Sequence, residues 1–542
     1  METLYRNARI WTGNPSGLDA GPESVELNAL LVVDGRIAWM GDKDALGRDV
    51  SAARRDHSAD GRDVSAAGWH PADAEGVVDL DGALVVPGFV DAHAHLSMTG
   101  LTQRGADLGT TASLRHALDA IESHARRSHG RPIYAPNWQE ANWPERRTMT
   151  NIELDRAAYG GVVYAPRIDV HSAVISSALA AASGAATLDG WLGNGLVTRA
   201  AHHAARAAFF AGITPAQRRG DIEAALRAAA ATGITHIHEC GGPDLSSADD
   251  FADVLALGRR PDLPATIGYW AQLVTTADEA RDVRADSGAH ALGGDLNIDG
   301  SLGSRTAHLR TPYADHPGRG NAYLTSEQVA AHVAACARAG IQSGFHVIGD
   351  AGLDIAIAGI ADAARRCGLD TIRAARVRLE HAEMADREAI AQLARLGVHT
   401  SVQPAFDAAW GGPAGMYAER LGRDRASGLN PLATMSLAGV PIAFGSDSPV
   451  TAFDPWGSIR AASAHHEPAQ RLSVAAGLTA HSWGGHCAAG DDAGGVLRVG
   501  AAATFTAWTV NDAGPDGLPR FDGTNDPACQ LTVRDGHTLF AR

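Results

Sequence analysis

The feature that most constrains the fold is a regular alternation of short β-type runs with alanine-rich helical runs between roughly residues 87 and 494. The helical runs, such as 326–340 and 387–397, place apolar residues at the spacing of an amphipathic helix. The β-type runs end in polar residues and occupy 88–95, 233–239, 265–270, 295–300, 342–350, 377–383, 397–404 and 441–447. Eight such units predict an α/β fold, a TIM-type (β/α)₈ barrel whose polar strand ends meet at one face.

Two further regions interrupt or flank this alternation. The gap between the first and second β-type runs, about 100–215, is too long for a barrel connection, so we expect an inserted subdomain there. Short apolar runs broken by Asp-Gly pairs occupy residues 1–86 and recur in 495–542. This sequence pattern is typical of β-hairpins. We therefore expect both ends to pair into one β domain outside the barrel, which spans 87–494.

Composition narrows the class of protein. The hydrophobic fraction of 45% and the net charge of −16 fit an ordinary soluble protein and disfavour a nucleic-acid-binding surface. The N-terminus has no signal-peptide pattern, and no stretch approaches the ~18 apolar residues of a membrane span. We therefore expect a cytoplasmic protein with no membrane partner. Five cysteines without CxxC spacing disfavour a disulfide framework or a cysteine zinc site.

Two local features concern the N-terminal part. The segment GRDVSAA occurs at 47–53 and again at 61–67, which we interpret as a surface loop lengthened by duplication. Lys43 is the only lysine of the chain, and every other basic residue is an arginine. A lysine-dependent mechanism is therefore not available to the barrel.

Histidines stand at the ends of several predicted strands. His93 and His95 in DAHAH lie two apart on a strand and would point the same way, as paired metal ligands must. With 24 histidines, about one such pair is expected by chance, and a second pair, His236 and His238, shows the need for context. The context is a set of further ligand-type residues at strand ends, namely His346, His381 and Asp447.

Imidazole and carboxylate groups gathered at one barrel face predict a divalent metal site. Such an ion lowers the pKa of a coordinated water and polarises a carbonyl group. Hydrolysis then needs a group that returns a proton to the leaving nitrogen, and Asp447 is placed for that role. These ligand types suit zinc, iron, manganese or nickel, and zinc is the ion we expect.

The motifs resemble those of the amidohydrolase superfamily, and within it the amidohydrolase-3 group of YtcJ-like proteins and N-substituted formamide deformylases. The shared motifs occur in the family's order over nearly the whole chain: PGFVDAHAHL, GITHIHECGGP, NIDGSLGSRTAHL, FHVIGDAGLD, RLEHAEM and GSDSPV, with NWPERR and RIDVHSAVISSAL in the insert. The resemblance implies a distorted barrel, a β-sandwich built from both termini and hydrolysis of a carbon–nitrogen bond. It also implies that His93, His95, His346 and His381 bind metal, and that Asp447 binds metal and acts as the acid/base.

The segment GGDLNIDGSLGSR departs from that pattern. Many relatives carry a lysine four residues before the DG, and its carboxylated side chain bridges two metal ions. In this chain the position is Asp295. Its shorter side chain favours one ion over two, although Asp295 could bridge directly or through water. GSLGSR lacks the spacing of either common phosphate-binding glycine motif, which disfavours a phosphate site.

Other polar residues are candidates for substrate binding. His238 and Glu239 end the second strand and could line the pocket or be buried for structural reasons. Asp299 could orient a ligand or the following loop, and Arg305 could contact a substrate carboxylate or carbonyl, or pair with Asp299. The insert could form a lid or an apolar wall with Trp143, His171, Trp191 and His202. We expect the aromatic residues of YWAQL and FDAAWGG to belong to the core.

The leading hypothesis is a metal-dependent amidohydrolase of a small amide or N-substituted formamide. A single-metal deaminase of a heterocycle is an alternative, for which Asp350 is the candidate extra acid near the fifth strand. A non-catalytic barrel that binds a metal or ligand is a second alternative, supported by the missing lysine. The partner we expect is a small molecule, and a homodimer is an open option for assembly.

Overall fold

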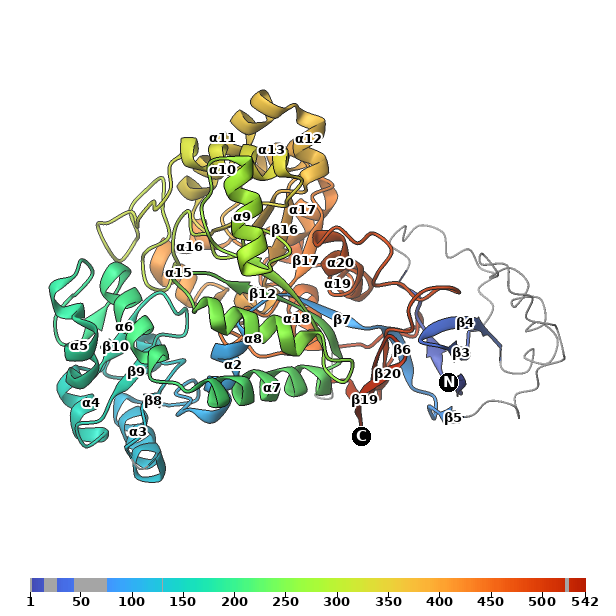
Figure 1. Cartoon of the computed structure of the whole chain (residues 1–542), viewed down its shortest axis with the longest axis horizontal. Coiled ribbons are helices and arrows are strands. Elements are labelled where there is room, and N and C mark those ends of the chain that lie inside the picture. The colour runs from blue at the N-terminus through green and yellow to red at the C-terminus, as the bar shows by residue number, and fades with distance from the viewer. Residues whose placement is uncertain (1, 14–26, 43–75, 129, 522–525) are drawn as a thin grey trace.

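The computed structural model describes residues 2–13, 27–42, 76–128, 130–521 and 526–542. The duplicated GRDVSAA segment and Lys43 lie outside these residues. The described chain is a mixed α/β fold with a barrel in the middle, the insert at one side and strands from both chain ends at the other (Figure 1).

Parallel strands from separate parts of the chain form the barrel wall. They are β7 (Phe89–Ala94), β12 (Ile234–Gly241), β13 (Ala265–Trp270), β14 (Gly344–Val347), β15 (Arg378–His381), β16 (His399–Val402) and β17 (Ile442–Phe444). The strand orders are β13-β12-β7 and β14-β15-β16-β17, and every ladder within them is parallel. An isolated bridge between Ala94 and Ser448 joins the first strand to the segment after the last. The polar ends of these strands therefore converge at one face.

The predicted fourth strand is irregular, which corrects the expectation for 295–300. Isolated parallel bridges at Ala291, Leu292 and Asn297 are its only ladder contacts among the described residues. Gly294 between them has a φ of +73°, a conformation that strands do not use. The glycine turn interrupts the ladder, so Asp295 emerges from a bent segment and not from a pleated strand.

Helices surround the strands and cover their outer faces. In chain order they are α2 (Leu96–Arg104), α7 (Pro215–Ala231), α8 (Ala248–Gly258), α9 (Ala277–Ser287), α10 (Ser326–Ala339), α11 (Asp350–Cys367), α12 (Leu369–Ala375), α13 (Arg387–Leu396), α14 (Pro404–Trp410), α15 (Met416–Leu421), α16 (Arg423–Ala426), α17 (Leu432–Leu437), α18 (Pro455–Ser463), α19 (Val474–Ala480) and α20 (Trp483–Ala488).

Local sequence signals and packing fix these helices. For example, α10 begins at a capping box of Thr325 and Gln328 and ends at Gly340 with a φ of +69°, as helix-end rules predict. Its apolar side packs with α11, α13 and the strands in a core that includes Phe345, Leu379 and other fully buried side chains. Burial of this apolar surface holds the barrel ring together.

Residues between β7 and β12 form a separate layer of helices and strands. Its sheet has the order β11-β10-β9-β8 and its own apolar core, which contains Trp138 and Trp143. The elements are α3 (Leu114–Ser128), β8 (Ile133–Tyr134), α4 (Asn151–Ala157), β9 (Val163–Pro166), β10 (Ala173–Ile175), α5 (Ser177–Ser183), β11 (Leu196–Val197) and α6 (Arg199–Ala211). Figure 1 shows this layer, drawn in cyan to green, beside the barrel.

Strands from the two ends of the chain form two further sheets. The first has the order β4-β3-β1-β5, and the second has the order β2-β6-β18-β19-β20. Their bounds are β1 (Glu2–Arg6), β2 (Arg9–Ile10), β3 (Ala29–Val33), β4 (Arg36–Gly41), β5 (Gly76–Asp79), β6 (Leu84–Pro87), β18 (Phe505–Thr509), β19 (Ala528–Arg534) and β20 (His537–Ala541). Antiparallel pairing of β6 with β18 joins N-terminal and C-terminal segments. The exact domain boundaries stay a prediction.

Candidate metal centre

The histidines and aspartates predicted as ligands lie together at the carboxyl ends of the barrel strands. His93 and His95 come from the end of β7, His346 from β14 and His381 from β15. Asp447 follows β17, and Asp295 follows the glycine turn described above. All four imidazoles are at most 4% exposed, so they meet in the interior and not at the surface.

The spacing of these groups suits a small cation. Asp295 Oδ1 lies 3.4 Å from His93 Nε2, and Asp295 Oδ2 lies 3.2 Å from His95 Nε2. Asp447 Oδ1 lies 3.5 Å from His93 Nε2 and 3.2 Å from His95 Nε2. Two atoms bound at about 2.0–2.1 Å to a tetrahedral zinc ion lie roughly 3.3–3.4 Å apart. The four nitrogen–oxygen separations are therefore in the range expected between ligands of one zinc ion.

His346 and His381 complete the cluster, and His381 also has a ligand atom within 4.8 Å of those of His93 and Asp447. His346 Nδ1 lies 3.5 Å from Asp295 Oδ1, and one ligand atom from each of Asp295, His346 and His381 lies within 4.8 Å of the others. Asp295 therefore belongs to two neighbouring sets of possible ligands. The structure brings together every side chain that was predicted as a ligand.

Hydrogen bonds fix the orientation of each imidazole. His93 Nδ1 lies 2.9 Å from Glu380 Oε2, and His95 Nδ1 lies 2.9 Å from the Cys240 carbonyl oxygen. His381 Nδ1 lies 2.8 Å from Gln403 Oε1, and His346 Nε2 lies 3.4 Å from the Gly300 carbonyl oxygen. These oxygens can only accept, so the outward nitrogens carry the hydrogens.

The other nitrogen of each ring therefore faces the carboxylates and, in the neutral ring, offers a lone pair to a metal ion. His93 Nε2 and Asp295 Oδ1 are buried and have no hydrogen-bond partner among the described residues. Burial lowers the pKa of His95, but Asp295 and Asp447 outweigh it and raise the value to about 10. Imidazole nitrogens and two carboxylates converge here, and a divalent metal ion can take the place of the proton that these carboxylates favour on His95, so the donor set fits such an ion.

Two of the predicted ligands occupy unusual backbone conformations. His381 has a φ of +69° and Asp447 a φ of +55°, a left-handed region that side chains other than glycine and asparagine rarely use. His381 is the last residue of β15, and Asp447 lies three residues after the end of β17. The turn re-aims their side chains into the cluster, and such strain is typical of functional sites.

A buried ion pair behind His93 was missed from the sequence. Arg378 Nε lies 2.7 Å from Glu380 Oε1, and both side chains are fully buried. Arg378 also donates to Glu380 Oε2 at 2.8 Å and to His238 Nδ1 at 2.7 Å. Burial would raise the pKa of Glu380, but the Arg378 guanidinium holds it at about 2. Glu380 is therefore an anion that orients His93 from behind.

Another group that includes Cys240 does not suit a metal. Cys240, His93 and Glu380 come within 4.8 Å of one another. Burial raises the pKa of the Cys240 thiol to about 12, and metal ligation needs the thiolate. Glu380 is already occupied by Arg378 and His93. This group therefore supports the centre and does not form a second one.

A small cavity of about 30 Å³ lies beside the cluster, and Asp447 is part of its wall. Phe406, Trp410 and Tyr417 line one side and belong to a buried apolar core, as the sequence predicts for the first two. The insert contributes Arg167, Asp169 and His171, and the His171 ring centroid lies 5.1 Å from that of His346. The insert therefore closes over the cluster.

The cavity wall contains polar atoms without partners. Arg167 Nη2, Glu383 Oε2 and Tyr417 Oη are buried and have no hydrogen-bond partner among the described residues. Burial raises the pKa of the Glu383 carboxyl to about 7. Arg167 begins the RIDVHSAVISSAL motif, although no role is predicted for it, and nothing in the sequence marks Tyr417, which reaches the cavity through packing of segments far apart in the chain.

The predicted substrate-binding residues occupy other positions. His238 is fully buried against Arg378, and Glu239 accepts the backbone N–H of Leu96 at 2.8 Å. Asp299 accepts the backbone N–H groups of Ile348, Gly349 and His308, so it orients the loop after β14. Neither His238, Glu239 nor Asp299 is part of the described cavity wall.

Arg305 and Asp350 also lie elsewhere. Arg305 pairs with Asp315 at 3.1 and 2.5 Å and not with Asp299, which is one of the two alternatives that the sequence leaves open for it. The difference arises because the long loop after Arg305 folds back and supplies Asp315. Asp350, the candidate acid of a deaminase, begins α11 and accepts the backbone N–H of Arg310. Neither residue is part of the cavity wall as described.

Of the insert residues named from the sequence, only His171 faces the cluster. Trp143 is buried in the core of the insert, and His202 is buried against the Tyr164 hydroxyl at 2.7 Å. Trp191 is partly buried in a neighbouring core of the insert. The aromatic lid expected from the insert is therefore a small polar lid made by Arg167, Asp169 and His171.

No helix in the described ranges has both the length and the apolar character needed to cross a bilayer.

Known proteins resemble this chain along most of its length. YtcJ of Bacillus subtilis is 26% identical over 406 residues, which cover 71% of this chain and 74% of that protein. The N-substituted formamide deformylase of Arthrobacter pascens is 26% identical over 481 residues, with 84% and 82% covered.

Solved structures share the fold. An uncharacterized metal-dependent hydrolase from Pyrococcus furiosus superposes with a TM-score of 0.67 at 22% identity, covering 94% of this chain and 98% of that one. The atrazine chlorohydrolase TrzN of Arthrobacter aurescens, solved with zinc, gives a TM-score of 0.56 at 15% identity, covering 99% and 95%. Residues 76–540 match the amidohydrolase family along its characteristic sequence pattern. The chain belongs to the amidohydrolase family.

Proposed function

We propose that this protein hydrolyses a carbon–nitrogen bond of a small amide or N-substituted formamide with the help of a divalent metal ion. The observation that carries the proposal is the set of four imidazole nitrogens whose lone pairs face two carboxylates. Membership of the amidohydrolase family supports the same reaction class. The family match and the donor set both favour catalysis over a non-catalytic binding role.

The proposed ligands are His93, His95, Asp295 and Asp447, and His346 and His381 lie next to this set. The nitrogen-to-oxygen separations of 3.2–3.5 Å in the first four support one ion in a tetrahedral setting. Zinc suits this mixture of imidazole and carboxylate groups. Elemental analysis of purified protein tests the stoichiometry: we expect one ion per chain, and two would assign His346 and His381 to a second ion.

A bound divalent ion supplies a water of lowered pKa and polarises the scissile carbonyl. Asp447 lines the cavity, where its carboxylate can take a proton and deliver it to the departing nitrogen. Arg167 Nη2, which has no partner in the described structure, can donate to the substrate oxygen as charge develops there. The wall residues Phe406 and Trp410 limit access of bulk water to the cavity.

The size of the cavity supports a small acyl group. Its volume of about 30 Å³ is far below the roughly 300–1,000 Å³ of typical small-molecule pockets, so only a small group fits beside Asp447. A formyl group is the smallest acyl group that an amide can carry, and the Arthrobacter pascens relative is named for removing one. We therefore propose a formamide with its formyl carbon beside Asp447 and its nitrogen substituent directed outward. The cytoplasmic location and a homodimer stay predictions.

Replacement of Asp447 tests the proposal. Asp447→Asn keeps the shape of the side chain but removes its base, so we expect turnover of an N-substituted formamide to fall by roughly 100-fold or more. Asp370→Asn, on the exposed start of α12, is the matched control and should hydrolyse at the rate of the unchanged protein. Undiminished hydrolysis by the Asp447 variant would exclude the proton-transfer role.

A further inference from the structure

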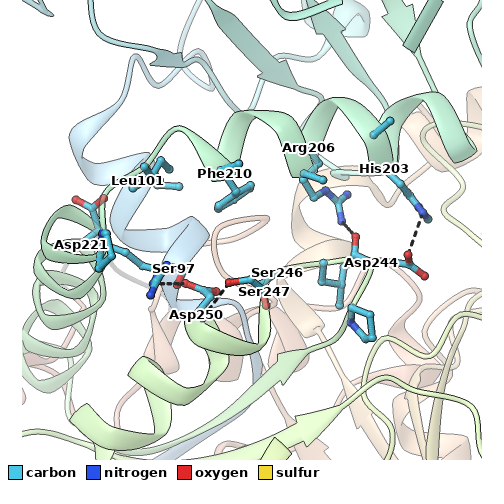
Figure 2. Close-up of a pocket in the computed structure, with 18 residues that line it drawn as sticks. Ser97, Leu101, His203, Arg206, Phe210, Asp221, Asp244, Ser246, Ser247 and Asp250 are labelled. Carbon is cyan, nitrogen blue, oxygen red and sulfur yellow. Dashed lines mark hydrogen bonds and ion pairs between the residues drawn. The ribbon is translucent and has the colours of Figure 1, made fainter. Parts of the chain in front are cut away.

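A second, much larger cavity lies between the insert and the barrel (Figure 2). Its volume is about 650 Å³, within the range of roughly 300–1,000 Å³ that small-molecule pockets occupy. Helix α6 of the insert covers it, while α2, the start of α7 and the segment 243–250 form the opposite wall. None of its lining residues belongs to the wall of the cavity beside the metal centre.

One wall of this cavity is apolar. Leu101, Phe210, Ile213 and Pro215 line it together with alanines of α6 at 204, 207 and 211. Figure 2 shows Leu101 and Phe210 above the space, facing the polar side chains below. Small side chains on the α6 face leave the space open, because larger residues at the same positions would fill it. The wall therefore suits an apolar body of moderate size.

The opposite wall carries a buried carboxylate with unused bonding capacity. Asp250 is 3% exposed, and its Oδ1 accepts the Ser97 hydroxyl at 2.5 Å. Its Oδ2 has no hydrogen-bond partner among the described residues, and neither does the Ser246 hydroxyl beside it. A buried carboxylate oxygen without a donor is costly. Burial also raises the pKa of Asp250.

The neighbouring cations are already engaged elsewhere. Arg218 donates from Nε and Nη2 to Asp253 at 2.9 and 2.7 Å, and its Nε is 3.7 Å from Asp250 Oδ1. Arg104 binds Asp221 through two bonds of 2.9 Å. The capacity that remains at the polar wall is that of the Asp250 carboxylate, an acceptor, and of the adjacent Ser246 hydroxyl, which can donate or accept.

Arg206 closes one end of the cavity without offering a free charge to it. Its guanidinium donates to the carbonyl oxygens of Asp244 and Val170. The Asp244 carboxylate at the same end is largely exposed and lies 3.8 Å from His203. An anionic ligand would therefore meet carboxylates with no unpaired arginine to offset them.

We propose that this cavity binds a small molecule that has an apolar body and a terminal N–H group, which donates to Asp250 Oδ2. The apolar body packs against Leu101, Phe210 and the alanines of α6. The ligand lies between the insert and α2, which begins at the residue after His95. This site is separate from the proposed hydrolytic reaction and does not depend on it.

Four probes of the same ring size test the chemistry. Benzylamine and benzamide carry the N–H donor, toluene lacks it, and benzoate replaces it with an anion. Ligand-detected NMR titration of the metal-loaded protein at neutral pH measures their Kd values. We expect benzylamine or benzamide to bind at least tenfold more tightly than toluene and benzoate, because a hydrogen bond to a charged or buried acceptor is worth roughly that factor. The tighter of the two identifies an amine or an amide ligand.

Four variants locate the binding. Asp250→Asn should weaken the N–H probe about tenfold, and Ala207→Leu, which narrows the cavity without touching Asp250, should weaken it as well. Ala200→Leu on an exposed turn of the same helix is the matched control and should change nothing. Asp447→Asn should also leave this binding unchanged, since it lies in the other cavity.

Three results would overturn the proposal. The first is that neither N–H probe shows saturable binding at millimolar concentration. The second is that benzoate binds as tightly as the N–H probes. The third is that Asp447→Asn abolishes binding of the N–H probe while Ala207→Leu leaves it unchanged. The last result would assign the probe to the metal centre. Because Ala207→Leu does not alter Asp250, the test stands even if Asp250→Asn folds poorly.

Discussion

The buried pair of Arg378 and Glu380 allows a quantitative prediction for Glu380→Gln. The Glu380 carboxylate accepts hydrogen bonds at Oε2 from Arg378 Nη2 at 2.8 Å and from His93 Nδ1 at 2.9 Å, and its Oε1 lies 2.7 Å from Arg378 Nε as an ion pair. A glutamine amide has one oxygen, so its NH₂ group would face a donor. The Arg378 charge would also remain in the interior without its counter-ion.

Two magnitudes follow from this geometry. Removing one partner of a buried ion pair costs about 3–5 kcal/mol of unfolding free energy. Loss of the acceptor that orients a metal-binding histidine lowers metal affinity by roughly 10–100-fold. We therefore expect Glu380→Gln to lower both the urea midpoint and the affinity for zinc.

The assay separates these effects with a second variant. In Arg378→Met with Glu380→Gln, the uncompensated charge is gone, so a substantial part of the stability should return. Metal affinity should stay low, because His93 still lacks its anionic acceptor. Unfolding in urea and titration with zinc measure the two quantities, and Glu388→Gln on the exposed start of α13 is the charge-matched control. If Glu380→Gln binds zinc within about twofold of the unchanged protein, the positioning role is refuted.

Other regions give three further expectations. His332 accepts the Val274 N–H at Nδ1, and burial lowers its pKa from 6.5 to about 4. Between these two pH values His332 is protonated in the unfolded chain but neutral in the folded protein. The free energy of unfolding therefore falls as the pH drops from 6.5 toward 4. In His332→Gln, the decrease in the free energy of unfolding between pH 7 and 4.5 should be about 2–3 kcal/mol smaller than in the unchanged protein. Urea unfolding at each pH measures this difference, and the same pH dependence of stability in both proteins would contradict it. Chelation with EDTA should lower the Tm and abolish hydrolysis, and zinc should restore both, whereas a Tm that does not respond to either would argue against a structural contribution of the ion. Leu393 lies on the buried face of α13, in the core. Leu393→Ala should lower the free energy of unfolding by about 2–5 kcal/mol but leave turnover per folded molecule unchanged, which calorimetry and kinetics can check.

The sequence predicts the parts of the site that depend on strand order. Ligand-type residues at the carboxyl ends of parallel strands must converge, whatever the details of packing. His93, His346, His381 and Asp447 lie within one cluster for that reason. The family resemblance, carried by the same motifs, is confirmed by the match over residues 76–540.

Contacts that depend on tertiary packing could not be predicted. The RLEH segment has the pattern of any strand, yet Arg378 and Glu380 lie inside the barrel because His93 and His238 approach from other strands. Arg305 contacts Asp315 only because a long loop folds back. Gly294 interrupts the fourth strand because its backbone adopts a positive φ, which the spacing of apolar residues along the sequence does not predict. In each case the deciding partner is remote in the chain or is the backbone itself.

The pairing of β6 with β18 has a consequence for biosynthesis. Leu84–Pro87 cannot complete their sheet until Phe505–Thr509 have been made, which is about 420 residues later on the ribosome. At roughly 5–20 residues per second, that delay is on the order of 20–80 s. During this time the β6 edge that β18 later covers is open to wrong partners. We expect refolding of the full chain to be slow and prone to aggregation at high concentration, with the terminal sheet forming last.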